Sequence, residues 1–223
     1  KLKGELGLTL NPETTRGNFV SNLRIELPLK RDLQKSEISY AVEADITAFS
    51  AENIIRGHKI ENASGKLTLT AAQLAIKGEG KIAGAPTTFE YMKPRGKPDA
   101  EFRFASHVDD ATRTRFGIEL SPALTGPVTV RAAGTTNDKE TLLHVDADLT
   151  AATIVELAPG WNKHAKRPAR AQFKLTERDG LFKLEDLAVT GSGVNLRGSL
   201  EIDPDGGVTA ANFTSFQLNE GDR

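Results

Sequence analysis

The residues that come nearest to a catalytic or metal-binding set are closely spaced carboxylates. Glu43 and Asp45 stand two residues apart, and Asp146 and Asp148 repeat this spacing with His144 before them. Residues two apart on a strand share one face, so such a set could bind a hard metal ion or act as an acid and a base. The opposite face of both segments is apolar, and the first pair has no matching histidine. We therefore favour carboxylates that face water.

Two glycine-rich stretches superficially resemble phosphate-binding loops. They are Gly78–Gly84 and Gly191–Gly198. A dinucleotide-binding fingerprint needs a third glycine three residues after the second, followed by a helix. Here the spacing differs and a strand pattern follows, so glycines at strand bends or bulges are the favoured interpretation.

The histidines and the single tryptophan give no catalytic pattern. His58, His107, His144 and His164 lie in unrelated local contexts, without metal-binding spacing. No nucleophile elbow of the type G-x-S-x-G occurs. Trp161 follows a short helix-like segment, and we interpret it as a packing anchor rather than a ligand contact.

Two clusters of basic residues are interpreted as solvated loops, with attraction to anionic lipid headgroups as the alternative. The clusters comprise Lys163, Lys166, Arg167 and Arg170, and Lys93, Arg95 and Lys97.

Composition excludes several classes of protein. The chain has 223 residues, 29 Lys and Arg against 30 Asp and Glu, and no cysteine. A disulfide scaffold, a zinc finger and a cysteine nucleophile are thereby excluded. The near-neutral charge argues against general nucleic-acid binding. No apolar run approaches the roughly 18 residues of a membrane span.

Most of the chain alternates apolar and polar residues with period two, which is typical of strands with one apolar face. In Glu37–Ile46, for example, every second residue from Ile38 onward is apolar or small. The other predicted strands are Leu2–Leu10, Asn18–Leu27, Ala63–Thr70, Gln73–Ile82, Thr87–Met92, Ala100–His107, Gly126–Ala133, Leu142–Leu149, Ala169–Glu177, Leu181–Thr190, Gly193–Asp203 and Val208–Phe216.

Helical signal is scarce. Ala48–Ile55, Asp109–Phe116 and Ala151–Leu157 could each form two turns, with Ser50 and Asp109 as caps of the first two. None is long enough for a βαβ crossover. The pattern therefore predicts an all-β protein with an antiparallel or meandering sheet.

Three stretches recur in the same order, which indicates an internal repeat of about a hundred residues. The pairs are Ala41–Thr47 with His144–Thr150, Ala63–Thr70 with Ala169–Thr176, and Leu74–Gly80 with Leu187–Gly193. We predict the tail of a preceding repeat at 1–36, one repeat at 37–136 and a second at 137–223. Because alternation begins directly after Lys1, we expect a segment of a longer protein.

The second repeat carries motifs that resemble the AsmA-like superfamily, in the branch related to YhdP and TamB. The matching stretches are Val145–Thr150, Gly160–Lys163, Asp179-Gly180, Gly191–Gly193, Leu196–Leu200, Ile202–Gly206 and Phe213–Leu218, with Gly117–Leu120 and Gly126–Val130 before them.

The resemblance implies an elongated, curled antiparallel sheet that forms an open groove, built from repeats with a few short helices between strands. It implies the periplasmic part of an inner-membrane-anchored protein of a Gram-negative bacterium. Such a protein guides phospholipid acyl chains between the inner and outer membranes, without catalysis and without a cofactor. Phospholipids and the two membranes are the expected partners, envelope proteins are possible further ones, and nucleic acid is not expected.

The apolar strand faces allow two interpretations, a dry sandwich core or a trough that stays open for acyl chains. In the second, the predicted lining residues are Leu67, Leu69, Leu74, Ile76, Ile82, Phe102, Phe104, Val128, Val130, Val145, Leu149, Phe173, Leu175, Leu196, Leu200 and Ile202. A structural or assembly module that binds proteins through its sheet edges is the alternative function. A hydrolase or sugar-binding domain is disfavoured because no convergent polar site is visible.

Overall fold

The computed structural model describes residues 10–34, 37–55, 57–157 and 160–217. These residues are nearly all β, with one short helix. The elements are β1 (Arg16–Glu26), β2 (Ser39–Ile55), β3 (His58–Thr70), β4 (Gln73–Ile82), β5 (Ala85–Pro94), β6 (Ala100–Val108), α1 (Asp110–Arg115), β7 (Leu124–Thr125), β8 (Val128–Thr136), β9 (Thr141–Asp148), β10 (Thr153–Val155), β11 (Asn162–Lys163), β12 (Arg170–Arg178), β13 (Leu181–Gly191), β14 (Val194–Ile202) and β15 (Val208–Gln217).

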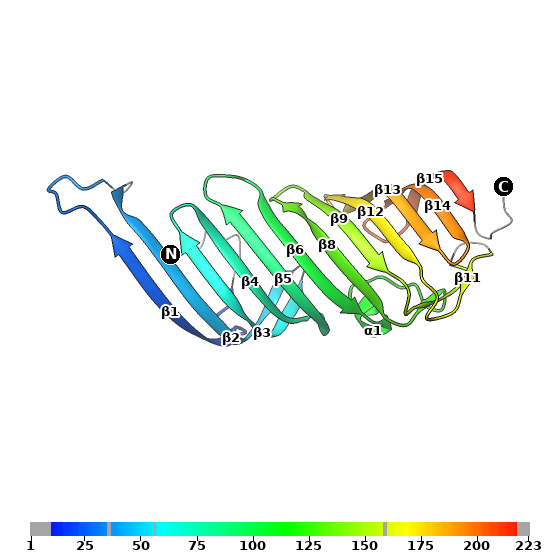
Figure 1. Ribbon diagram of the computed structural model, residues 1–223, viewed down its shortest axis with the longest axis horizontal. Helices are drawn as coiled ribbons and strands as arrows, with labels where there is room; N and C mark the ends of the chain where they lie inside the picture. Colours follow the sequence, from blue (N-terminus) through cyan, green and yellow to red (C-terminus); the bar gives the residue numbers. More distant parts are fainter. Residues whose placement is uncertain (1–9, 35–36, 56, 158–159, 218–223) are drawn as a thin grey trace. The chain divides into compact units, whose positions relative to one another are not determined.

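Twelve strands form one antiparallel sheet, in the order β1-β2-β3-β4-β5-β6-β8-β9-β12-β13-β14-β15. The sheet is not closed, because β1 and β15 each pair on one side only within the described residues (Figure 1). A smaller sheet has the order β11-β10-β7. The chain divides into two compact units, Lys1–Phe102 (unit 1) and Arg103–Arg223 (unit 2).

The all-β class and the antiparallel sheet are confirmed, and the predicted strands within the described residues fall on observed ones. Gln73–Ile82 coincides with β4. The predicted strand Leu2–Leu10 lies outside the described residues except for its last residue. The predicted helix at Asp109–Phe116 is α1, and the Asp109 carboxylate accepts a hydrogen bond from Thr112 N at 2.8 Å, as its cap.

The other two predicted helices are wrong. Ala48–Ile55 continues β2, where Ala48 has a φ of 51° and the register to β3 shifts repeatedly. These shifts are bulges, which break the period-two pattern without ending the strand. Ala151–Leu157 contains β10, which pairs with β7 and β11.

Two-residue turns connect several neighbouring strands. Ala83-Gly84, Asp179-Gly180 and Ser192-Gly193 each have positive φ at both positions, which is the type I′ geometry of tight hairpins. Both glycine-rich stretches therefore contain a hairpin turn, and the remaining glycines of Gly78–Gly84 lie within β4. Gly78 and Gly80 thus lie within a strand, whereas the bulge beside them, between Glu61 and Ser64, is in β3.

The first two matching pairs lie on neighbouring strands, β2 and β3 in unit 1 and β9 and β12 in unit 2. The third matching pair occupies different positions. Leu74–Gly80 lies near the start of β4, whereas Leu187–Gly193 covers the end of β13 and the turn after it. The repeat boundaries at 36/37 and 136/137 stay a prediction. The division into compact units falls at a different place, after Phe102.

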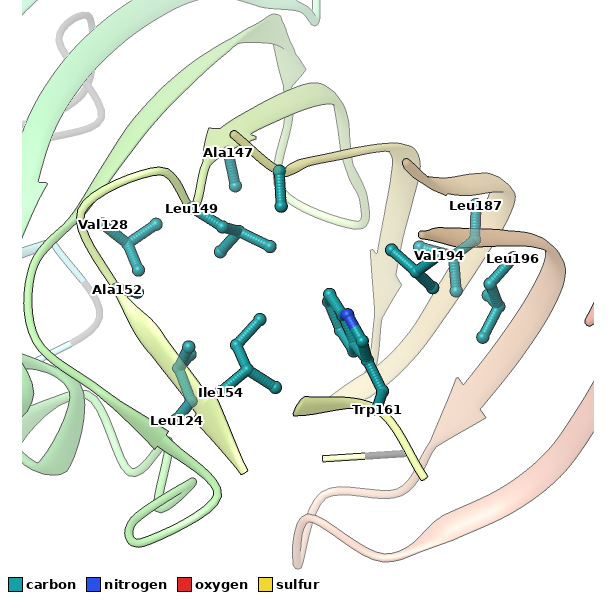
Figure 2. Packing of buried hydrophobic residues seen from close by; sticks show 11 residues of the cluster. Leu124, Val128, Ala147, Leu149, Ala152, Ile154, Trp161, Leu187, Val194 and Leu196 are labelled. Atoms are coloured by element: carbon teal, nitrogen blue, oxygen red, sulfur yellow. The ribbon is translucent and has the colours of Figure 1, made fainter. Parts of the chain in front are cut away.

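Unit 2 has a hydrophobic core between its part of the large sheet and the smaller sheet. Figure 2 shows Trp161, Ile154 and Leu124 facing Leu149 and Val194, with the strands of the large sheet curving around the cluster. Trp161 is 4% exposed. Its prediction as a packing anchor is confirmed, although a strand rather than a helix precedes it.

Candidate functional site

The candidate site is the apolar face of unit 1, here called the inner face. Residues directly opposite in an antiparallel sheet point to the same side, so the register defines the face. One row across β1 to β4 reads Leu23, Val42, Leu69 and Leu74. The adjacent row contains Ala44, Leu67, Ile76 and Tyr91, and a third contains Phe19, Ile46 and Phe89.

Among the described residues of unit 1, no second layer of strands faces the inner face. Every described strand of this unit belongs to the large sheet. A sandwich core would need a facing sheet at about 10 Å. The described strands of unit 1 therefore form a single layer and not a sandwich.

The opposite side of unit 1, here called the outer face, carries cross-strand ion pairs. Lys77 lies 2.6 Å from Glu90, and Lys66 lies 3.6 Å from Asp45. The lysine side chains of these pairs are 77% and 82% exposed, which indicates solvated pairs of small energetic weight. These ion pairs thus lie on the face opposite the apolar rows.

Five predicted lining residues lie together on the inner face of unit 1. Leu67 is opposite Ile76, and Leu69 is opposite Leu74. Ile82 pairs with Ala85 at the other end of β4. Leu67, Leu69 and Ile76 are partly exposed, whereas Leu74 and Ile82 are buried.

In unit 2, several predicted lining residues belong to the hydrophobic core. Val128, Leu149 and Leu196 are core members, and Val130, Phe173 and Leu200 pack against them. The smaller sheet and Trp161 occupy the space that an acyl chain would need there.

The remaining predicted residues are spread over four strands. Val145 of β9 is the cross-strand partner of Phe173, Leu175 of β12 that of Leu184, and Ile202 of β14 that of Phe182. Phe102 and Phe104 lie on β6 and are partly buried.

The prediction missed the aromatic and β1 residues of the inner face. Phe19, Leu23 and Ile25 are 73%, 62% and 53% exposed on β1, although Leu23 and Ile25 lie opposite Val42 and Tyr40. Alternation in β1 was visible in the sequence. The pairing of β1 with β2 was not visible in the sequence, and this pairing places the apolar side chains of β1 on the inner face.

The inner face ends at polar side chains. Tyr40 of β2 is opposite Ile25, and Lys93 of β5 is opposite Leu74, so both belong to the inner face. Arg95 follows β5, and its Nη1 donates a hydrogen bond to the Tyr40 hydroxyl at 2.8 Å. We call Tyr40, Lys93 and Arg95 the rim. Nearby on β5, burial raises the pKa of Tyr91 above its ordinary value.

The carboxylates of β9 are engaged by neighbouring groups. Asp146 accepts hydrogen bonds from Arg170 Nε at 2.8 Å and Gln172 Nε2 at 2.9 Å, and these bonds lower the pKa of Asp146 below its usual range. Asp148 accepts a hydrogen bond from Thr150 N at 2.8 Å, and the side chain of Thr150, together with this backbone bond, lowers the pKa of Asp148. In the part of the chain that the structure describes, no group of three His, Cys, Asp or Glu residues could hold a metal ion.

Lys163 contradicts its prediction as a solvated residue. It is 2% exposed, and its Nζ donates to the carbonyl oxygens of Thr150, Ala152 and His164 at 3.3, 2.5 and 3.2 Å. Burial lowers the pKa of Lys163, and the charge of Asp148 partly offsets this. The side chain thus ties the loop that carries β10 and β11, and it is not available to a headgroup.

Comparison with family models, with curated proteins and with solved structures gives no match. Among the described residues, no helix has the length and apolar character needed to span a membrane.

Proposed function

We propose that this chain is a non-enzymatic section of an AsmA-like periplasmic protein that guides phospholipid acyl chains between the inner and outer membranes. The observation that carries the proposal is the inner face of unit 1, an apolar surface across five strands that form a single layer among the described residues of this unit. Aliphatic side chains without fixed polar partners suit a sliding hydrocarbon chain better than a rigid small molecule.

The proposal restricts the acyl-chain surface to unit 1. In unit 2 the corresponding residues are packed against the smaller sheet. Among the predicted lining residues of unit 1, three lie on the inner face and are also partly exposed, namely Leu67, Leu69 and Ile76. Phe89 and Tyr91 extend the same surface onto β5.

Photo-crosslinking tests this proposal. A photoreactive residue in place of Leu67 or Ile76 is expected to capture phospholipid in a Gram-negative envelope, as detected by mass spectrometry of the purified adduct. The matched controls replace Thr68 and Ala75, which are the next residues on the same strands and face outward. Equal capture on both faces, or none on the inner face, contradicts the proposal.

A second candidate function is an assembly module that binds proteins through its sheet edges. The observation in its favour is β1, which is exposed along its whole length. An edge strand offers unpaired backbone groups to another strand. A photoreactive residue at Asn22 that captures a protein, with no lipid adduct at Ile76, would favour this function.

A further inference from the structure

The inner face changes character along β5. Ala85, Thr87, Phe89, Tyr91 and Lys93 follow one another at every second position on this face. At one end of this row the side chain of Ala85 is small, apolar and buried, with 1% exposed. At the other end the row carries the ammonium group of Lys93. Arg95 continues the same alternation beyond the strand.

The rim joins the two sides of this surface. The hydrogen bond from Arg95 to Tyr40 connects the end of β5 with the start of β2, which are separated in the sheet by β3 and β4. The backbone of Arg95 also donates to Ala72 O at 2.7 Å, in the turn between these two strands. Three polar groups are therefore held at one end of the apolar surface, within reach of its last rows.

The length of the surface fits an acyl chain. Lys93 stands eight positions after Ala85, which corresponds to about 27 Å at the rise of an antiparallel strand. The acyl chains of one leaflet extend about 15 Å. A chain that starts at the rim therefore lies along Tyr91, Ile76 and Phe89, which are partly exposed, and ends before the buried positions Thr87 and Ala85.

The charge of the rim fits an anionic headgroup. Lys93, Arg95 and Lys97 stand against one acidic residue, Asp99, in the segment 93–99. Lys93 Nζ donates to the carbonyl oxygen of Pro98, so its ammonium is held at the rim. Glu37, three residues before Tyr40 in the sequence, is paired with Lys30, and this pair contributes no net charge.

We propose that Tyr40, Lys93 and Arg95 hold the phosphate of an anionic phospholipid whose acyl chains lie on the inner face. The guanidinium group matches phosphate geometry with its planar fork of N–H donors, and the ammonium adds a point charge. The inference rests on the proposed function and adds a headgroup preference to it. In this arrangement unit 1 binds amphiphiles in one orientation, with the headgroup at the place where β2 begins and β5 ends.

Lipid selectivity of the full chain tests the inference. The protein is incubated with vesicles of phosphatidylcholine mixed with phosphatidylglycerol, separated from them, and extracted for mass spectrometry. We expect phosphatidylglycerol to be enriched on the order of tenfold over its share in the vesicles. The double variant Lys93→Gln/Arg95→Gln should lose this enrichment while it still binds lipid.

A variant pair with the same charge change provides the control. Lys66→Gln/Lys77→Gln removes two cations from the outer face, where they pair with Asp45 and Glu90, and should keep the enrichment. If the rim double variant does not fold, the single variants are compared, and each should lose about threefold of the enrichment.

The outcomes separate the two proposals. Lipid binding without enrichment in the unchanged protein, or an enrichment that survives in the rim variants, overturns the headgroup assignment and leaves the proposed function standing. No bound lipid of either kind overturns both.

Discussion

Asp146 shows how neighbours fix a side chain that resembled a catalytic carboxylate. Its side chain is 23% exposed and receives hydrogen bonds from Arg170 and Gln172 of the adjacent strand. Charge-assisted bonds of this kind stabilise the ionised form. The carboxylate therefore joins β9 to β12.

We predict a pH-dependent contribution of Asp146 to stability. A carboxyl group whose pKa is lower in the folded state stabilises the fold above its unfolded pKa, and this is lost as the pH falls through the folded pKa. Asp146→Asn should lower the free energy of unfolding by about 1 kcal/mol at neutral pH. The difference from the unchanged protein should shrink below about pH 4. Urea unfolding from neutral to acidic pH measures this.

Asp45→Asn is the matched control, because Asp45 also faces outward but lies 3.6 Å from its lysine partner. It should cost less than Asp146→Asn at neutral pH. A pH-independent difference for Asp146→Asn would refute the assignment.

Among the elements, β3 and β4 approach each other closely at paired glycines. Gly65 is opposite Gly78, and a Cβ at Gly78 would collide with the Ser64 carbonyl oxygen and lie 3.1 Å from the Gly65 Cα. The Phe89 ring comes within 3.3 Å of the same point. The aromatic side chain thus fills the space that the two glycines leave on the inner face.

Gly78→Val should therefore destabilise the protein, although valine favours strands. We expect a loss of about 2–3 kcal/mol, because backbone atoms must move to admit the side chain. The control is Ala75→Val on the outer face of the same strand, which should change stability by less than about 0.5 kcal/mol. Urea midpoints followed by circular dichroism compare the two. Equal effects would contradict the close approach.

For the whole molecule, the two units differ in how they bury apolar residues. Unit 2 encloses a cluster that includes Trp161, Ile154 and Leu149. The strands of unit 1 have no facing sheet within the described residues. Unit 2 should therefore resist denaturant better.

Trp161 is the only tryptophan, so its fluorescence reports on unit 2 alone. Circular dichroism reports on the strands of both units. We expect ellipticity to be lost at lower urea concentration than the change in tryptophan fluorescence. Coincident transitions would indicate that both units unfold as one cooperative unit.

Strand positions were predictable because alternation persists through most of the sheet, as in β4. Bulges interrupt the alternation of apolar and polar residues. In β2 the extra residue at Ala48 shifts the apolar positions, so Ala48–Ile55 lost its period and was predicted as a helix. β10 has three residues, too few to show any period.

The candidate site was predictable only in part. Leu67 and Ile76 follow from alternation within their own strands. The rim depends on β2 and β5, which lie far apart in the sequence and meet through the hydrogen bond of Arg95 to Tyr40. The burial of Lys163 likewise depends on three carbonyl groups that the loop brings together, and local residue type indicates the opposite.

The smaller sheet of unit 2 supports the curvature of the large sheet mechanically, because the two sheets share one hydrophobic core. Flattening the strands that curve around it would open gaps between Trp161, Leu149 and Val194, and a close-packed interior resists this. The described strands of unit 1 have no second sheet that supports them in this way. Bulges at Ala48 and Asn62 already bend the neighbouring strands β2 and β3. A load on the chain would therefore change the curvature of unit 1, while unit 2 keeps its own.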